Sequence, residues 1–200
     1  MIQTRPHSFT AVQILLAAIF VVFIAQNIYP SVTTTFMFDP NNLQPWMFVS
    51  SIFLHASLIH IFFNAYALWM FGPVLERRLG FYKFMALFFA GGLVGSIGYY
   101  ATILAGITPA YPALGASGAI YAVLGATAML APELVVLLFG IVPLTMRQAA
   151  LLWVALEVLG TFNTSSGIAS AAHLGGLILG FAWGKWEIEK AKSELRQKWR

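Results

Sequence analysis

The chain has 200 residues, of which 60% are hydrophobic and 9% are charged, and its formal net charge is +4. About one quarter of the residues in an ordinary soluble domain are charged, so this composition excludes a soluble globular protein. It excludes a disordered chain for the same reason. The mean hydropathy of +0.80 instead indicates a polytopic helical membrane protein. The chain has no cysteine, which excludes disulfides and thiol chemistry.

Six segments, taken in chain order, are predicted to be transmembrane helices. A helix needs about 20 apolar residues to cross the hydrocarbon core. The longest uncharged run is divided by a turn-forming stretch that contains Pro109 and Pro112, because proline stops a helix. We expect the first segment to be a retained helix, since its apolar stretch is longer than a signal peptide needs. The predicted spans are 9–29, 51–71, 83–104, 115–130, 147–162 and 168–186, with an apolar stretch at 134–144 before the fifth.

The positions of the basic residues predict the topology. If the N-terminus is cytoplasmic, six spans place all 11 Lys and Arg residues in or beside cytoplasmic segments. The outer loops at 30–50, 105–114 and 163–167 then contain none. This pattern follows the positive-inside rule, so both termini are predicted to be cytoplasmic. We expect the basic tail to contact anionic lipid headgroups rather than nucleic acid.

The chain is expected to form one membrane domain over residues 1–200. It contains no repeat of about 20–50 residues and no low-complexity tract. The first span, at about 9–29, is followed by a core at about 46–186 and a basic cytoplasmic tail at 187–200. The predicted fold class is therefore an all-α polytopic membrane protein with six transmembrane helices.

A serine and a histidine in two of the predicted spans are candidates for nucleophilic catalysis. Ser117 lies at the start of the fourth span, and His173 lies near the outer end of the sixth. A serine hydroxyl becomes a nucleophile when an imidazole accepts its proton. Backbone N–H groups at a helix N-terminus can also stabilise a developing oxyanion. The alternative for Ser117 is a role in close helix packing or helix capping.

Small residues beside these two side chains predict that the fourth and sixth spans pack closely. Gly176 lies on the same helix face as His173, and Gly118 follows Ser117 on the fourth span. Small residues repeated at intervals of four allow two membrane helices to approach at short range. This packing would place the serine and the histidine at a similar depth below the outer surface.

Two polar residues of the second span are candidates for stabilising an oxyanion. His60 and Asn64 are four residues apart and therefore lie on one helix face. Both side chains can donate a hydrogen bond to a carbonyl oxygen that becomes negative. The alternative is an interhelical hydrogen-bond cluster. His55 is about 140° around the same predicted helix, and we expect it to face elsewhere.

The acidic residues do not suggest a catalytic triad. Asp39 is the only aspartate and lies in an outer loop, and Glu157 is the only acid within a predicted span. We therefore expect a Ser/His dyad, with Tyr121 one turn after the serine and able to position the imidazole by stacking. Glu157 is a functional candidate because of its depth in the membrane; the alternatives are a structural hydrogen bond and an interfacial position.

Three motifs in this order resemble those of the rhomboid family of intramembrane serine proteases, in its minimal six-helix prokaryotic form. They are His60-x-x-x-Asn64 in the second span, Gly115-Ala116-Ser117-Gly118 at the start of the fourth, and Ala172-His173-Leu174-Gly175-Gly176 in the sixth. The resemblance runs from about Trp46 to Trp186 and includes Glu76-Arg77-Arg78-Leu79-Gly80.

The resemblance implies a serine endopeptidase that cleaves transmembrane segments of other membrane proteins. It implies that Ser117 is the nucleophile and His173 the general base, in a water-filled cavity open to the outside. His60, Asn64 and the backbone N–H of Ser117 would form the oxyanion hole. No cofactor, metal or nucleic acid is implied. The expected partners are single-span substrates and the lipid bilayer, and the expected location is the plasma membrane of a prokaryote.

The same resemblance assigns supporting roles near the serine. Tyr121 matches the residue that packs against the catalytic histidine, and Gly115 and Gly118 would support the site. The loop at 30–50 would lie in the outer leaflet. One departure concerns this loop, because many family members have Trp-Arg where this chain has Trp46-Met47. We therefore expect a loop-anchoring interaction of the arginine to be missing.

Two other functions remain open at this point. The first is a catalytically silent rhomboid-like protein that binds membrane clients, although such relatives typically lose the serine or the histidine. The second is a metal transporter or metalloprotease that uses His55, His60 and His173. Zinc proteases of this kind need His-Glu-x-x-His, which this sequence lacks.

Overall fold

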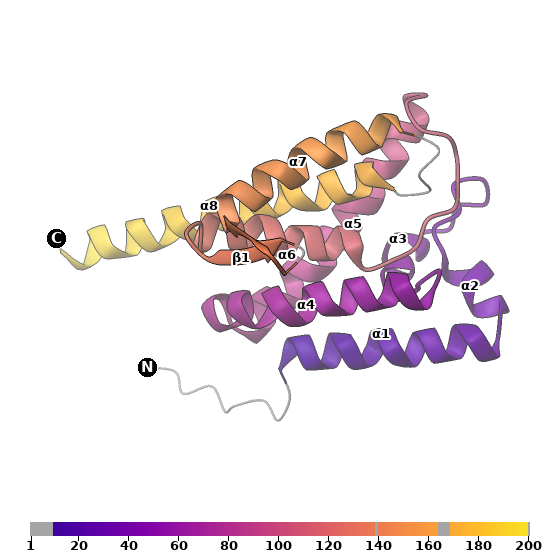
Figure 1. Ribbon diagram of the computed structural model, residues 1–200, viewed down its shortest axis with the longest axis horizontal. Coiled ribbons are helices and arrows are strands. Elements are labelled where there is room, and N and C mark those ends of the chain that lie inside the picture. Colours follow the sequence, from indigo (N-terminus) through magenta and orange to yellow (C-terminus); the bar gives the residue numbers. More distant parts are fainter. Residues whose placement is uncertain (1–9, 139, 164–168, 200) are drawn as a thin grey trace.

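The computed structural model describes residues 10–138, 140–163 and 169–199, and these ranges are mostly helical. Long helices form a bundle, in which α1 begins and α8 ends at the same end (Figure 1). Two short helices and a 3-10 turn lie in the loop after α1. The helices are α1 (Ala11–Ile28), α2 (Ser31–Phe36), α3 (Met47–Ser50), η1 (Ser51–Phe53), α4 (Leu58–Leu79), α5 (Phe81–Leu104), α6 (Ser117–Leu130), α7 (Met146–Phe162) and α8 (Ser170–Lys198).

The six long helices occupy the six predicted ranges, but the second prediction is wrong at both ends. Helix α4 begins at Leu58 because the Ser57 hydroxyl accepts a hydrogen bond from the backbone N–H of His60 at 3.1 Å. It continues past Phe71 to Leu79 and ends at Gly80, whose φ is 77°. By length and composition, α1, α4 and α5 could each cross a membrane, and α6 is a shorter apolar helix. The predicted starts at 9 and 168 lie outside the described residues.

The all-α prediction is wrong for the stretch before α7. Strands β1 (Val135–Leu138) and β2 (Val142–Thr145) pair as an antiparallel hairpin, with Val136 opposite Leu144. β-branched residues favour strands, and Gly140, with a φ of 74°, lies in the turn. The sequence could not distinguish this hairpin from a helix, because short apolar runs give no clear period.

Helix α6 is the centre of the bundle and lies in direct backbone contact with α8. Every residue from 118 to 128 except Tyr121 is buried. A Cβ atom on Gly176 would overlap the carbonyl oxygen of Gly118, and one on Gly180 would overlap that of Ala122. Glycine is therefore needed at these two positions of α8, because any side chain would push the two helices apart.

Charged side chains connect the helix ends at the side of the bundle where α1 begins. The Glu76 carboxylate accepts hydrogen bonds from the backbone N–H groups of Ala11 at 2.7 Å and Val12 at 3.2 Å. Arg78 donates to the carbonyl oxygen of Leu130, the last residue of α6. An acid at a helix N-terminus and a base at a C-terminus both complement the helix dipole. Within the described ranges all Lys and Arg residues lie at or beyond this end, namely Arg77, Arg78, Lys83, Arg147, Lys185, Lys190, Lys192, Arg196 and Lys198.

The loop between α1 and α4 is anchored by apolar packing. Met47, which stands where many family members have arginine, is 3% exposed and belongs to a cluster with Phe38 and Tyr99. Backbone hydrogen bonds also join Phe38 to Ala113 in the loop before α6. The indole N–H of Trp46 donates to the carbonyl oxygen of Thr35 at 3.3 Å. The loop is thus held without an arginine, by a buried thioether and aromatic rings.

Replacing Glu76 with alanine is expected to destabilise the fold by about 1–2 kcal/mol, because the first N–H groups of α1 lose a charged acceptor. The measurement is the thermal unfolding midpoint Tm of the purified protein in detergent micelles. The matched control is Glu189→Ala, which removes an exposed acid paired with Lys192 on the tail of α8 and should leave Tm unchanged. An equal Tm for both variants would contradict the capping role of Glu76.

Candidate active site

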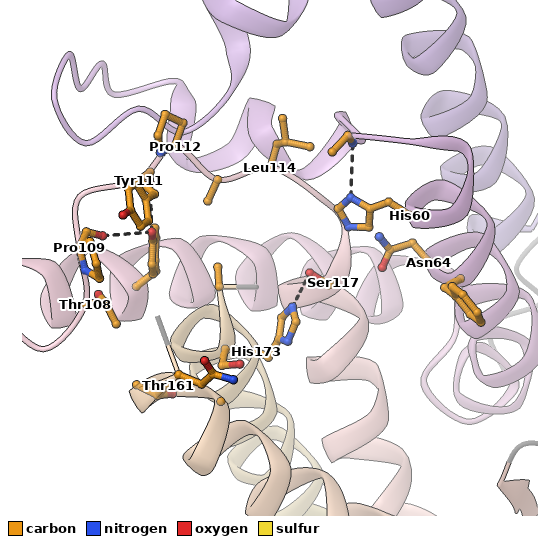
Figure 2. Close-up of a pocket in the computed structure, with 18 residues that line it drawn as sticks. His60, Asn64, Thr108, Pro109, Tyr111, Pro112, Leu114, Ser117, Thr161 and His173 are labelled. Atoms are coloured by element: carbon orange, nitrogen blue, oxygen red, sulfur yellow. Dashed lines mark hydrogen bonds between the residues drawn. The ribbon is translucent and has the colours of Figure 1, made fainter. Parts of the chain in front are cut away.

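Ser117 and His173 meet at the contact between α6 and α8. The Oγ atom of Ser117 lies 2.7 Å from Nε2 of His173, which is a hydrogen-bond distance. Ser117 is the first residue of α6, where helical N–H groups lack intrahelical partners. His173 lies in the first turn of α8. The structure thus brings together the two residues that the sequence analysis selected as nucleophile and base (Figure 2).

The ring of Tyr121 and the carboxylate of Glu157 hold the imidazole of His173 in place. The rings of Tyr121 and His173 are stacked, with centroids 4.5 Å apart and an interplanar angle of 6°. The Oε1 atom of Glu157 lies 3.0 Å from Nδ1 of His173, and the Tyr121 hydroxyl donates to the same oxygen. Helix α7 thus brings Glu157, which the sequence analysis left open as a functional or structural residue, to the histidine.

Two hydrogen-bond donors of α4 lie on the side of Ser117 that is opposite His173. Figure 2 shows His60 and Asn64 on the opposite side of Ser117 from the imidazole of His173. Nδ1 of His60 accepts a hydrogen bond from the backbone N–H of Ala56 at 3.4 Å, so the neutral ring carries its proton on Nε2. The buried Nδ2 of Asn64 has no hydrogen-bond partner among the described residues. Both groups are available to a ligand.

Because Gly115 has no side chain, the ring of His60 has room beside Ser117. Its φ of 134° is strained for any residue with a side chain, and a Cβ atom there would lie 2.8 Å from Nε2 of His60. Gly118, in contrast, faces α5 and α8, where a Cβ atom would lie 3.5 Å from the carbonyl oxygen of Ala172. The first glycine therefore shapes the site, and the second lies in the helix contact behind it.

These side chains line an open cavity of about 480 Å³. His60, Asn64, Ser117 and His173 contribute to its wall, together with the loop at 108–114 and the facing ends of α7 and α8. Several lining groups are polar, so water can occupy it. A peptide carbonyl placed in this cavity could meet the serine, the imidazole and the two donors of α4 together.

His55 lies next to His60, contrary to the prediction that it faces elsewhere. It precedes α4, so the angle calculated along a helix does not apply. Its side chain is buried, its ring centroid is 5.1 Å from that of His60, and Gln26 of α1 accepts a hydrogen bond from its backbone N–H at 2.9 Å. Gln26 was missed by the sequence analysis. Among the described residues no group of three His, Cys, Asp or Glu side chains could hold a metal ion.

Acid is expected to weaken the fold through His55. Burial, with a smaller contribution from nearby His60, lowers the pKa of His55 from 6.5 to about 4. Between these values the unfolded chain binds a proton that the folded chain does not, so stability falls as the pH falls from 6.5 to 4. The full loss of folding free energy is about 3 kcal/mol. Tm should therefore decrease less between pH 7 and pH 4 in His55→Gln than in the native chain; an identical decrease would contradict this assignment.

Comparison with known proteins places the site in a family. A family model described as the rhomboid domain matches residues 42–189. The chain is 36% identical over 152 residues to the mitochondrial rhomboid protein 1 of Saccharomyces cerevisiae, covering 75% of this chain and 44% of that protein. It is 34% identical over 143 residues to the rhomboid protease GluP of Bacillus subtilis, covering 68% and 25%.

The similarity extends to the rhomboid protease GlpG of Yersinia enterocolitica, which is 32% identical over 152 residues, covering 74% of this chain and 50% of that protein. The chain thus spans half or less of the length of these three relatives. The matched region contains the serine, both α4 donors, the stacked tyrosine and the histidine. From the match over residues 42–189 and these identities, we conclude that the chain belongs to the rhomboid family.

Proposed function

We propose that the chain is an intramembrane serine endopeptidase that cleaves transmembrane segments of membrane-protein substrates. The observation that carries this proposal is the 2.7 Å separation between Ser117 Oγ and His173 Nε2 at the wall of an open cavity. Similarity to proteins that are named rhomboid proteases supports the same reaction. A single serine held by an imidazole is the minimum that acyl transfer needs.

In the proposed reaction, Ser117 Oγ attacks the carbonyl carbon of the scissile peptide bond while His173 Nε2 takes the hydroxyl proton. The tetrahedral oxyanion accepts hydrogen bonds from His60, from Asn64 and from the backbone N–H of Ser117 at the start of α6. His173 then passes the proton to the leaving nitrogen, and the peptide bond breaks. Water from the cavity attacks the acyl-enzyme, again with His173 as base, and releases the second product.

The proposal includes six spans with both termini in the cytoplasm of a prokaryote, within a single domain over residues 1–200. The basic residues gathered at one end of the bundle support it, since that end would be cytoplasmic. The basic tail at 187–200 would then meet anionic headgroups of the inner leaflet. The cavity lies toward the other end of the bundle, which would face the outside. A single-span substrate would enter from the bilayer and unwind locally, so small helix-weakening residues near its cleaved bond are expected.

Ser117→Ala and His173→Ala should each abolish cleavage of a single-span substrate in proteoliposomes, because each removes a partner of the proton transfer. The control is Ser193→Ala, which removes an exposed hydroxyl from the tail of α8 and should cleave at the native rate. A fluorophosphonate probe should label the native chain and not Ser117→Ala. Cleavage by either active-site variant at the native rate, or a native chain that neither cleaves nor is labelled, would refute the proposal; the second result would favour a client-binding role.

Asn64→Ala should lower kcat by about 100-fold with little change in KM, because its amide would bind the oxyanion and not the ground-state carbonyl. Asn27→Ala, which alters an exposed amide at the end of α1, is the matched control and should retain the native kcat. Steady-state cleavage kinetics in proteoliposomes provide the measurement. A change confined to KM would show that Asn64 binds substrate without stabilising the transition state.

A further inference from the structure

We propose that Glu157 is a positioning residue that acts through His173, so that this chain uses a Ser–His–Glu arrangement instead of a dyad. The inference rests on the proposed function and deepens it. The two ring nitrogens of His173 face different partners: Nε2 is hydrogen-bonded to Ser117 Oγ at 2.7 Å, and Nδ1 lies at ion-pair distance, 3.0 Å, from Glu157 Oε1 without hydrogen-bond geometry. This is the order of contacts that defines a catalytic triad.

The carboxylate determines which nitrogen of His173 carries the proton. A negative oxygen 3.0 Å from Nδ1 attracts a proton there and repels a lone pair, so it favours the neutral tautomer in which Nδ1 is protonated. The lone pair of Nε2 then faces the Ser117 hydroxyl and can receive its proton. Without the carboxylate, nothing at Nδ1 would favour this tautomer over the other, in which Nε2 carries the proton and cannot act as a base.

Glu157 is itself held in place by the groups around it. Tyr121, from α6, donates its hydroxyl to Oε1 while its ring stacks on the imidazole, and the Ser170 hydroxyl of α8 lies on the same side of α7 as the carboxylate. Gly160, one turn along α7, leaves room for this pair, since a Cβ atom there would overlap the Ser170 hydroxyl. Side chains of α6 and α8 thus converge on one acid of α7.

Burial strengthens the electrostatic interaction between the Glu157 carboxylate and His173. It also argues against an incidental contact between these two side chains. Glu157 is 8% exposed and His173 is 9% exposed, so solvent screens their interaction only weakly. Among the described residues, His173 is the only basic side chain within 4.0 Å of Glu157. An acid at membrane depth is costly unless it has a partner or a task, and here the partner is the proposed base.

In the reaction, the proton moves from Ser117 Oγ to His173 Nε2 as the new C–O bond forms, which leaves a positively charged imidazolium. The negative carboxylate 3.0 Å from Nδ1 stabilises that charge and remains unprotonated throughout. When the tetrahedral intermediate collapses, the proton passes from Nε2 to the leaving nitrogen and the imidazole is neutral again. Glu157 never touches the substrate, so its effect should appear in kcat and not in KM.

Glu157→Gln tests the inference, because it keeps the shape of the side chain and removes its charge. We expect kcat for cleavage to fall by about 100- to 10,000-fold at unchanged KM, and fluorophosphonate labelling of Ser117 to slow in parallel. Glu157→Asp, which keeps the charge, should recover part of kcat. The matched control is Glu133→Gln, an exposed acid paired with Arg147, with native kinetics.

A purely structural role for Glu157 predicts a different outcome. Glu157→Gln would then lower Tm, while the folded fraction would retain the native kcat; that result would overturn the inference. If Glu157→Gln does not fold, Tyr121→Phe removes one hydrogen bond from the carboxylate and keeps the stacked ring. It should lower kcat several-fold at unchanged KM, and native kinetics would again overturn the inference. An inactive native chain would instead refute the proposed function.

Discussion

The backbone contact between α6 and α8 is the constraint on which the rest of the structure depends. The two helices touch where Gly176 meets the carbonyl oxygen of Gly118, with no room for a methyl group between them. Lipid chains are as apolar as the helices, so association in a membrane relies on close van der Waals contact. Since Ser117 starts one helix and His173 lies on the other, this contact also determines the distance between the reacting atoms.

Charged side chains occupy two regions of the bundle and have a different role in each. At one end, Glu76, Arg78 and Lys83 connect helix termini to one another, near the water where their charges cost little. In the interior, the acid Glu157 is surrounded by hydrogen-bond donors and by the imidazole of His173. This polar site is tolerated among apolar helices because Glu157 has partners on two neighbouring helices, while Ser117 and His173 line the cavity.

The sequence predicted the features that depend on local composition. The glycines of α8 and α6 predicted that Ser117 and His173 would lie at similar depth, because small residues at helical spacing determine how closely helices approach. The positions of the six long helices followed from hydropathy. The start of α4 could also have been predicted, since Ser57 three residues before His60 is a capping position.

The structural features that could not be predicted from the sequence depend on the orientation of each helix about its own axis. Apart from Glu157, the middle of α7 is apolar all round its axis, so its sequence does not say which face meets α8, and the partner of Glu157 could not be chosen. The contact between Gln26 and the backbone of His55 joins α1 to a segment outside any helix. The hairpin before α7 was missed because its apolar residues suit a strand or a helix equally well.

The wall of the cavity has two structurally independent parts. The reacting side chains come from helices locked by backbone contact, whereas Thr108, Pro109 and Tyr111 come from a loop fastened separately, through the bridge to Phe38 and the Tyr99 hydroxyl. Side chains of the loop can therefore be exchanged without altering the spacing of the serine and the imidazole. The fold is thus a scaffold in which one wall of the cavity can be redesigned while the spacing of Ser117 and His173 stays fixed.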